Sequence, residues 1–527
     1  MKAQNMLGVM VDCSRNAVLS LNGVKKYIDA LAKMGYNTLM LYTEDTYEVE
    51  GEPFFGYLRG RYSAQELRAI DKYAAENKIE LVPCIQTLAH LNAIFRWPEY
   101  RAINDVADIL LAGDEGTEQF IEKMFKSLRS CVSTDKIHIG MDEAHMIGLG
   151  KYLDRHGFCN RTEILLKHLD KVCKICKKYG FSPMMWSDMF FRLANGGEYY
   201  RPIDDSRIDE IKSLIPENLT LVYWDYYNKS EDVYRSMLEA HKKLSDKVAF
   251  AGGVWTWAGY VTNNKYAFDV TQPAINVCRE VGVNNVLLTS WGDNGGECSP
   301  MSALPALFYA AELYRGNSES DSIKKKFSEV FGEDFDLVVS QSEINIDFKN
   351  EKCHHSSKSI LACDVLLGLY DTVIAEDSDA QFSAVSKKFS EASEKTQMFK
   401  LHFEALSSMA DALSKKALLG VQLREAYSSG DRKALEELCS VKLPAASDAV
   451  RNFINAYRRL WLSEKKPHGF DVQEMRLGGV AARIDGAAVR VREYLDGKAD
   501  SIPELEEAIY DISPFYNWND SASTNIF

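Results

Sequence analysis

Two adjacent carboxylates, Asp142 and Glu143, are the residues whose types and spacing most directly suggest chemistry. They follow the apolar residues Ile137 and Ile139, and Gly140 stands just before them. Two anions at the end of a buried strand repel each other and resist desolvation, so a purely structural sequence has little reason to place them there. A carboxyl that keeps its proton beside an ionised neighbour is typical of sugar chemistry. The alternative is a solvated turn in which one of the two carboxylates caps the next helix.

The adjacency of these carboxylates also bears on mechanism. An ordinary retaining glycosidase takes its acid and its nucleophile from different elements, with the two carboxyls about 5–5.5 Å apart. Neighbours in sequence share one side of a sugar more readily than they bracket it, which disfavours a carboxylate nucleophile. If the substrate carries a 2-acetamido group, its carbonyl oxygen can attack instead. One carboxylate then orients the amide N–H, while the other protonates the departing oxygen.

The elements that must position these side chains alternate between strand and helix from the N-terminus to about residue 315. Short apolar runs predict strands at 7–11, 38–42, 80–84, the run that ends on the carboxylates, 184–187, 219–224, 248–251 and 285–289. Amphipathic segments predict helices at 21–34, 64–77, 117–131, 163–179, 232–244, 273–281 and 305–315. This α/β pattern of eight repeats predicts a (β/α)8 TIM barrel. A doubly wound sheet would need a glycine-rich turn after the first strand, and the sequence has none there.

In such a barrel the chemistry lies on the loops that follow the carboxyl ends of the strands. The polar and aromatic residues at these ends are, in chain order, Asp12, Arg15, Glu44, Asp45, Gln86, His90, His138, Asp142, Glu143, Trp186, Asp188, Trp224, Asp225, Tyr226, Tyr227, Trp255, Trp257, Trp291, Asp293 and Glu297. Five of the eight tryptophans fall in this set. Gathered together they favour a pocket with aromatic walls, for a ligand whose apolar C–H faces are ringed by hydroxyls.

The segment Ile137-His-Ile-Gly-Met-Asp-Glu143 resembles the H-x-G-x-D-E signature of glycoside hydrolase family 20, the exo-β-N-acetylhexosaminidases. The resemblance covers about residues 6–315. Asp12-Cys-Ser-Arg15 is similar to the first-strand D-x-x-R of the family, and His90 to its third-strand histidine. Trp291-Gly-Asp293 is similar to the terminal W-x-E, with Asp in place of Glu. The chain length and the helical C-terminal region are most similar to the compact intracellular branch of the family.

The resemblance implies a role for each matching residue. Asp142 would hold the acetamido nitrogen, and Glu143 would be the general acid and later the base for water attack on an oxazolinium intermediate. Arg15 would grip the hydroxyls at C3 and C4. The other expected substrate-binding residues are Trp186, Trp224 and one of Trp255 or Trp257 around the acetamido methyl, Trp291 beneath the ring, Asp293 at O4 or O6, and Tyr226 at the acetamido carbonyl.

Alternatives stay open for the tyrosine at the acetamido carbonyl and for the two histidines. Period-two alternation places Tyr226 on the side of Trp224, which favours it over Tyr227. His90 and His138 belong to the expected substrate site, yet they receive no chemical step and are favoured to brace the carboxylates by hydrogen bonds.

The sequence also departs from the family pattern. The segment 42–45 is not the commoner W-H-L-x-D, so the roles of Glu44 and Asp45 stay open. Asp293 is one methylene shorter than Glu, which would shift tolerance between gluco and galacto substrates. Because the first strand begins almost at Met1, the usual N-terminal α/β domain of the family is not expected.

The composition and net charge limit the classes of partner that the protein is expected to bind. The formal net charge of −14 argues against nucleic acid, whose binding proteins carry basic stripes. Since no apolar run reaches about 18 residues, no membrane span is expected. Eleven scattered cysteines without an export signal predict reduced thiols in the cytoplasm. Cys173 and Cys176 form a C-x-x-C whose helical spacing favours packing over metal or redox chemistry. No metal or cofactor is expected.

Past residue 316 the strand signals give way to charged amphipathic segments at 324–333, 360–375, 382–430 and 448–494. This change predicts a catalytic barrel over residues 1–316 and a helical C-terminal domain over 317–527. The helical domain would pack on the barrel or form a subunit contact, which leaves a homodimer possible.

The leading hypothesis is a β-N-acetylhexosaminidase that releases terminal β-linked GlcNAc or GalNAc from oligosaccharides with retention. One alternative is a conventional retaining glycosidase, with Glu44 or Asp293 as the nucleophile opposite Glu143. Another is a non-catalytic amino-sugar-binding protein, against which the intact Asp142–Glu143 pair speaks, because binding alone needs no proton donor.

Overall fold

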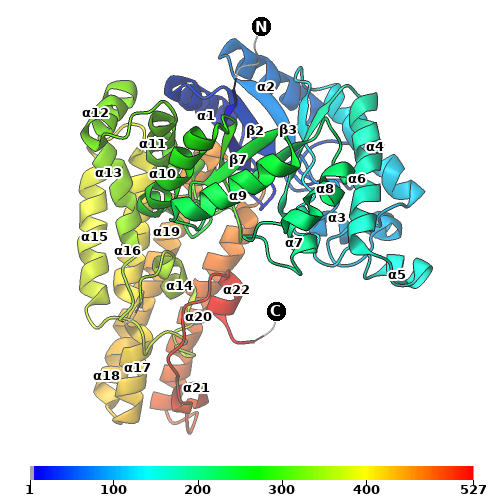
Figure 1. The fold of residues 1–527 in the computed structure, drawn as a ribbon. Helices are drawn as coiled ribbons and strands as arrows, with labels where there is room; N and C mark the ends of the chain where they lie inside the picture. Colours follow the sequence, from blue (N-terminus) through cyan, green and yellow to red (C-terminus); the bar gives the residue numbers. More distant parts are fainter. Residues whose placement is uncertain (1–4, 350, 526–527) are drawn as a thin grey trace. The chain divides into compact units, whose positions relative to one another are not determined.

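A closed barrel of eight parallel strands forms the first part of the chain (Figure 1). The computed structural model describes residues 5–349 and 351–525. The strands are β1 (Leu7–Asp12), β2 (Thr38–Tyr42), β3 (Glu80–Cys84), β4 (Lys136–His138), β5 (Ser182–Trp186), β6 (Thr220–Trp224), β7 (Val248–Gly253) and β8 (Val286–Ser290). Each strand pairs with its neighbours in chain order, and β1 closes the barrel against β8. The predicted TIM barrel is therefore confirmed.

Helices connect successive strands, as the alternation in the sequence predicted. They are α1 (Leu21–Met34), α2 (Ala64–Glu76), α3 (Asn92–Phe95), α4 (Glu115–Arg129), α5 (Lys151–His156), α6 (Arg161–Lys178), α7 (Asp188–Ala194), α8 (Asp205–Leu214), α9 (Glu231–Leu244), α10 (Asn264–Val281) and α11 (Leu304–Tyr314). Local signals fix their ends. The Ser20 side chain accepts the Gly23 N–H to start α1, and Gly35 ends it at φ 77°. Ser63 and Glu66 form a reciprocal capping box at the start of α2.

The interior of the barrel is apolar. Met10, Met40, Val82, Val222 and Leu287 are fully buried in one cluster. Several strand residues also bury their outward-facing side chains beneath the helices, as in other parallel sheets. This packed interior supports the strand ends, where the polar candidates lie.

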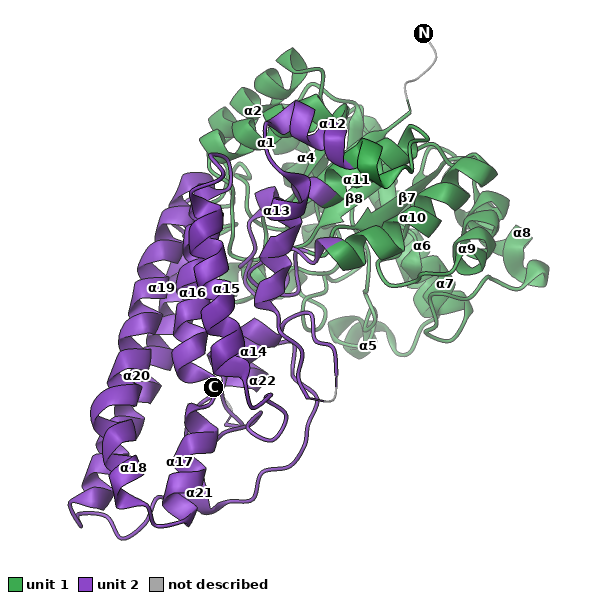
Figure 2. Cartoon of the chain, turned by 90° about the vertical axis from the view of Figure 1, so that its left-hand side faces the viewer, with its two compact units in different colours: residues 1–255, 265–292, 306–323 green, residues 256–264, 293–305, 324–527 purple. Residues whose placement is uncertain are grey.

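The chain divides into two compact units, coloured separately in Figure 2. Unit 1 comprises residues 1–255, 265–292 and 306–323, and unit 2 comprises 256–264, 293–305 and 324–527. The loops that follow β7 and β8 thus belong in part to unit 2, although the chain continues into α10 and α11 after them. The domain boundary expected at residue 316 stays a prediction.

Helices follow the barrel, as predicted. They are α12 (Ser320–Phe331), α13 (Phe335–Val339), α14 (Ser356–Ala362), α15 (Ser378–Ser393), α16 (Lys400–Lys416), α17 (Leu419–Ser428), α18 (Arg432–Glu437), α19 (Leu443–Glu464), α20 (Phe470–Leu495), α21 (Pro503–Glu506) and α22 (Trp518–Ala522). Within unit 2, α15 packs on α16, α16 on α19, and α19 on α20 (Figure 2). Across the part of the chain that the structure describes, every helix is too short or too polar to cross a membrane.

The expected helix over residues 360–375 is wrong in its extent, because α14 ends at Ala362. Two side chains compete with the helical hydrogen bonds there. Asp364 accepts the N–H groups of Leu366 and Leu367, and the buried Lys416 donates to the carbonyls of Ile360 and Cys363. Neither contact is visible in the periodicity of the sequence.

Candidate active site

The two carboxylates at the end of β4 face the same imidazole. His90 Nε2 lies 3.2 Å from Asp142 Oδ2 and 3.8 Å from Glu143 Oε2. The Asp142 side chain is nearly buried, whereas 42% of the Glu143 side chain is exposed. Adjacent residues therefore present their acids to one side of the chain, one enclosed and one open to solvent.

The backbone conformation after β4 orients the two carboxylates in this way. Gly140, Met141 and Glu143 all have positive φ angles, of 73°, 69° and 51°. A Cβ on Gly140 would lie 2.1 Å from Gln86 Oε1, the atom that accepts the Met141 N–H at 3.1 Å. Each non-glycine residue held in this region costs about 1–3 kcal/mol, and such strain clusters at functional sites.

Asp142 is held as an anion. Gln86 Nε2 donates to Asp142 Oδ1 at 2.7 Å and also contacts the Tyr42 hydroxyl at 2.9 Å. Burial alone would raise the pKa of Asp142, but His90 and the Gln86 amide outweigh burial and lower it below the usual value. The carboxylate is therefore ionised at neutral pH.

His90 carries the matching positive charge. Burial alone would lower its pKa, but the Asp142 carboxylate and then Glu44 raise the pKa to about 10. The His90 backbone, at φ 58°, donates its N–H to Asp108 Oδ2 at 2.9 Å. His90 is thus an imidazolium at neutral pH, and it braces Asp142.

A third carboxyl, the buried Asp188, supports the turn after β4. It is the first residue of α7, and its Oδ2 accepts the Glu143 N–H at 3.1 Å and the Arg192 Nε–H at 3.2 Å. Burial and the neighbouring Asp142 raise the pKa of Asp188 to about 7. Arg192 Nη2 also lies 3.9 Å from Glu143 Oε1.

Arg15 and Glu44 form a second polar group, at the ends of β1 and β2. Arg15 Nη2 lies 3.1 Å from Glu44 Oε1, which also accepts the Tyr42 hydroxyl at 3.0 Å. Burial, opposed by Arg15, raises the pKa of Glu44 to about 7. Asp12 Oδ2 accepts the Gly292 N–H at 3.0 Å, which ties the end of β1 to the loop after β8. About a third of the Arg15 side chain is exposed, so its guanidinium can reach a ligand.

Aromatic rings line the same end of the barrel. Trp186 and Trp291 lie 6.0 Å apart between ring centroids, and Trp291 meets the edge of Tyr42 at 4.8 Å. Trp224 stacks on Tyr226 at 5.3 Å, and the Tyr226 hydroxyl is hydrogen bonded by Trp291. Trp186 is fully buried in the core of the barrel, whereas Trp224 and Trp291 are only partly buried against that core.

Two family models match the chain on either side of residue 300. Residues 6–244 match the glycosyl hydrolase family 20 catalytic domain, and residues 334–524 match the glycoside hydrolase 20C C-terminal domain. The chain belongs to glycoside hydrolase family 20. The first match contains β4 and its carboxylates.

Individual relatives of this family 20 chain are distant. Hexosaminidase D of Bos taurus is 23% identical over 237 residues, or 43% of this chain and 62% of the bovine protein. The human Hexosaminidase D is 23% identical over 204 residues, covering 37% of this chain and 39% of the human protein. Both matches thus span less than two thirds of the relatives' own length.

Among solved structures, one enzyme of the same family is also only distantly similar to this chain. The family 20 exo-β-N-acetylglucosaminidase from Vibrio harveyi, in complex with N-acetylglucosamine, superposes with a TM-score of 0.48 at 15% identity. The superposition covers 64% of this chain and 59% of the Vibrio chain.

Of the remaining predicted residues of the family 20 site, His138 and Trp255 lie in unit 1, and Trp257 and Asp293 lie in unit 2. His138 is fully buried against Trp186, with ring centroids 4.2 Å apart, and it accepts the Gly140 N–H at 3.2 Å. Because burial lowers the pKa of His138 to about 3, it is a neutral brace for the turn rather than an exposed binding group. Trp255 donates its indole N–H to the Tyr226 carbonyl at 2.9 Å. Trp257 and Asp293 belong to unit 2, and their roles stay predictions.

Sequence reasoning assigned no role to Gln86, Asp188 or Arg192. Gln86 and Asp188 are each the second residue after the end of β3 and β5, so their position near the strand ends was a usable signal. Arg192 lies one helical turn after Asp188 on α7, where an i, i+4 ion pair is expected. What the sequence could not show is that Gln86 and Asp188 both contact the turn after β4.

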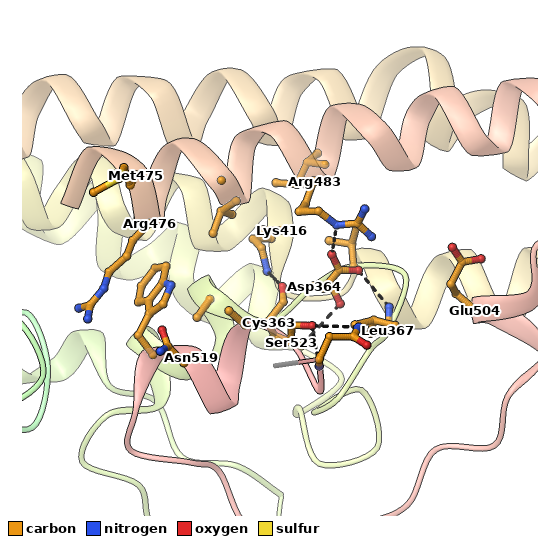
Figure 3. A pocket seen from close by; sticks show the side chains of 18 residues that line it. Cys363, Asp364, Leu367, Lys416, Met475, Arg476, Arg483, Glu504, Asn519 and Ser523 are labelled. Atoms are coloured by element: carbon orange, nitrogen blue, oxygen red, sulfur yellow. Dashed lines mark hydrogen bonds and ion pairs between the residues drawn. The ribbon is translucent and has the colours of Figure 1, made fainter. Parts of the chain in front are cut away.

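Unit 2 contains a cavity of about 700 Å³, shown in Figure 3. Its charged groups are engaged with protein partners: Arg483 Nε lies 2.5 Å from Asp364 Oδ2, and Lys416 Nζ donates to two backbone carbonyls. In residues 5–349 and 351–525, no cluster of three or more His, Cys, Asp or Glu side chains is arranged to hold a metal ion. The cluster of titratable side chains at the end of β4 is therefore the candidate active site.

Proposed function

We propose that this protein is an exo-acting β-N-acetylhexosaminidase that removes terminal β-linked GlcNAc or GalNAc from oligosaccharides. The reaction proceeds with retention, and the acetamido oxygen of the substrate acts as the nucleophile. The observation that carries the proposal is the shared orientation of Asp142 and Glu143 toward His90. Had the two side chains pointed to opposite faces of their chain, they could not serve one sugar together.

The environments of the two acids suit different tasks. Asp142, ionised and fixed by Gln86 and His90, accepts the acetamido N–H and stabilises the positive charge that develops as the oxazolinium ring closes. Glu143, half exposed beside it, donates a proton to the departing oxygen. It then removes a proton from the water that opens the ring.

The surrounding side chains supply binding. Arg15 contacts the hydroxyls at C3 and C4, and Asp293 accepts hydrogen bonds from O4 or O6. The indoles of Trp186 and Trp224, together with Trp255 or Trp257, enclose the acetamido methyl, with Trp291 beneath the ring. Tyr226 steadies the acetamido carbonyl, which its burial beside Trp224 favours over the half-exposed Tyr227.

Glu44 is one of the two carboxylates, with Asp293, that a conventional retaining mechanism could use as its nucleophile. The Tyr42 hydroxyl and Arg15 both occupy its Oε1, and burial raises its pKa to about 7, so it is only partly ionised at neutral pH. A nucleophilic carboxylate must be ionised and directed at the anomeric carbon. These contacts therefore favour the acetamido oxygen as the nucleophile.

Glu143→Gln tests the proposed activity. The parent chain is expected to hydrolyse an aryl β-N-acetylglucosaminide, and the variant to lose about 10²–10⁴-fold in kcat/KM, because it cannot donate or accept the proton. Glu163→Gln, on the exposed face of α6, is the matched control and should retain parental activity. A parent without activity on GlcNAc and GalNAc glycosides would leave the amino-sugar-binding alternative.

Inhibitors separate the two enzymatic mechanisms. A thiazoline that mimics the cyclic intermediate should inhibit the parent chain strongly, because Asp142 stabilises the same charge. A 2-fluoro sugar should leave no covalent adduct on the intact protein when its mass is measured. An adduct on Glu44 or Asp293 would instead establish a carboxylate nucleophile.

The cytoplasm is the compartment that we propose for this activity. All eleven cysteines are free thiols, and ten of them are buried. Burial raises the pKa of Cys173 to about 12, in keeping with packing on α6 rather than redox chemistry. The proposed partner is the oligosaccharide substrate.

A further inference from the structure

The loop that follows β8 is held by side chains from the C-terminal helices. The chain passes from unit 1 to unit 2 between Gly292 and Asp293, directly after Trp291. Within unit 2, five successive backbone carbonyls of this loop each accept a hydrogen bond from a side chain. The donors belong to α19, to the residue that ends it, and to α20, two helices that lie side by side in Figure 2.

The contacts run in order along the loop. They are Arg476 to the carbonyl of Asn294 at 2.5 Å, Gln473 to Gly295 at 3.1 Å, Lys465 to Gly296 at 2.7 Å, Tyr457 to Glu297 at 2.7 Å, and Lys465 again to Cys298 at 2.9 Å. Gln473, Lys465 and Tyr457 are buried. Three buried polar side chains are thus committed to fixing one short stretch of backbone, and leaving these groups unpaired would be costly.

The backbone of the loop needs such support. Asn294, Gly295 and Gly296 have successive positive φ angles of 58°, 122° and 61°. A Cβ on Gly295 would lie 2.6 Å from an Arg476 nitrogen, so only glycine lets the donors approach this closely. A run of left-handed residues persists only where the surroundings over-determine it.

An ion cluster fixes the same loop through a side chain. Both oxygens of the buried Glu297 carboxylate are engaged, Oε2 by Lys358 at 2.7 Å and Oε1 by Arg476 at 3.0 Å. Arg476 therefore grips the loop through both a carbonyl and a carboxylate. It also lines the cavity of Figure 3, together with other residues of α20.

We propose that Tyr457, Lys465, Gln473 and Arg476 are positioning residues for sugar recognition. By setting the course of the backbone after residue 293, they fix the position from which the Asp293 side chain extends. The helical C-terminal domain thereby governs discrimination at the O4 hydroxyl, the position at which GlcNAc and GalNAc differ. This inference rests on the proposed function for its substrate, but the fixing of the loop is measurable without it.

Tyr457→Phe and Gln473→Met test the inference, because each removes one donor while keeping most of the side-chain volume. Tyr427→Phe is the control, since it removes a tyrosine hydroxyl that bonds Glu506 and the Ile502 N–H elsewhere in unit 2. Hydrogen exchange followed by mass spectrometry reports on amides 293–298. Kinetics on aryl β-GlcNAc and β-GalNAc substrates report on recognition.

Both donor variants should speed exchange at 293–298, and Tyr427→Phe should not. Each should also raise KM on the order of fivefold and shift the GlcNAc-to-GalNAc ratio of kcat/KM by a similar factor, which is the effect of one lost hydrogen bond. The kcat should change little, because Asp142 and Glu143 are untouched.

If amides 293–298 exchange no faster in the two donor variants than in Tyr427→Phe, the inference is overturned. Faster exchange with an unchanged substrate ratio would overturn the link to sugar recognition. A parent chain that hydrolyses neither glycoside would reject the proposed function alone, and the exchange data would then decide whether these helices fix the loop.

Discussion

His90 lies between the enclosed Asp142 and the partly exposed Glu143. Asp142 has a lowered pKa, while burial brings the pKa of both Glu44 and Asp188 to about 7. Asp142 is thus an anion, while Glu44 and Asp188, which interact with the same group of charges, titrate near neutrality. Such a separation of pKa values is how an active site assigns different tasks to chemically similar groups.

Asp142→Asn should impair the reaction far more than binding. The amide cannot stabilise the positive charge that develops on the acetamido group, so kcat should fall about 10²–10³-fold. Binding of a non-hydrolysable thioglycoside of GlcNAc, measured by calorimetry, should weaken much less. Equal losses in kcat and affinity would show that Asp142 contributes only ground-state binding.

Asp188→Asn should change how stability depends on pH. The pKa of Asp188 is about 7 in the folded protein and about 3.9 when unfolded, so the folded state binds its proton more tightly. Its contribution to stability is therefore fully present below pH ~3.9 and is lost as the pH rises through about 7.

Urea unfolding of the parent between pH 4 and 7 should reveal this loss, at up to about 1.4 kcal/mol per pH unit for one carboxyl. Asp188→Asn should flatten that slope. Asp170→Asn, an exposed carboxyl on α6, should leave the slope unchanged. Parallel slopes for Asp188→Asn and the parent would mean that Asp188 titrates normally.

Residue types indicated part of this site, but the contacts between strands could not be predicted. Asp142, Glu143 and His90 were identified by motif and strand-end position, and the structure brings them together. Gln86 and Asp188 were seen at strand ends without a role. Their role depends on a turn whose φ angles are positive at Met141 and Glu143, and non-glycine residues give no sequence signal for that conformation.

The secondary-structure elements were predicted best where hydrophobic period and caps agree. The helix Leu21–Met34 and the strands Thr38–Tyr42 and Glu80–Cys84 have the expected ends. The expected helix over 360–375 failed because long-range donors and a local Asp decide where it stops. The ends of a helix can therefore be predicted from sequence where its own hydrophobic period and caps define them. A helix end that is set by hydrogen bonds from distant side chains cannot.

The turn after β4 depends on Gly140, so Gly140→Ala should disable it. The new Cβ would clash with Gln86 Oε1 at 2.1 Å and with the Ile85 carbonyl at 2.7 Å, in addition to the cost of a left-handed alanine. Gly180→Ala is a matched control, because Gly180 has φ +68° and open space around it.

Both variants should lose about 1–2 kcal/mol of unfolding free energy from the backbone alone. Gly140→Ala should lose more and should also fall at least about tenfold in kcat/KM, since the carboxylates move with the turn. Urea unfolding and hydrolysis of an aryl glycoside measure the two effects. Similar losses in both variants would show that the contact with Gln86 does not matter.

For the whole molecule, the two compact units do not coincide with two successive stretches of sequence. Periodicity revealed a barrel followed by helices, because each element carries its own pattern. It could not reveal that segments 256–264 and 293–305 belong with the helices. That membership depends on donors such as Tyr457 and Gln473, which lie far along the chain from the carbonyls they bind.

A chain that stops at residue 316 should therefore lack a working site, although it contains every barrel strand. Its loop at 294–298 would lose the four side chains that donate its five hydrogen bonds, and Tyr260 would lose its ring contacts with Phe453 and Tyr457. Re-exposing one such aromatic side chain costs about 1.5–3 kcal/mol. Thermal unfolding by circular dichroism should show a lower Tm for residues 1–316 than for the full chain, and hydrolysis of both GlcNAc and GalNAc glycosides should be lost. A truncated chain that kept the parental Tm and kcat/KM would show that the barrel fixes its own loops, and the helical domain would then need another explanation.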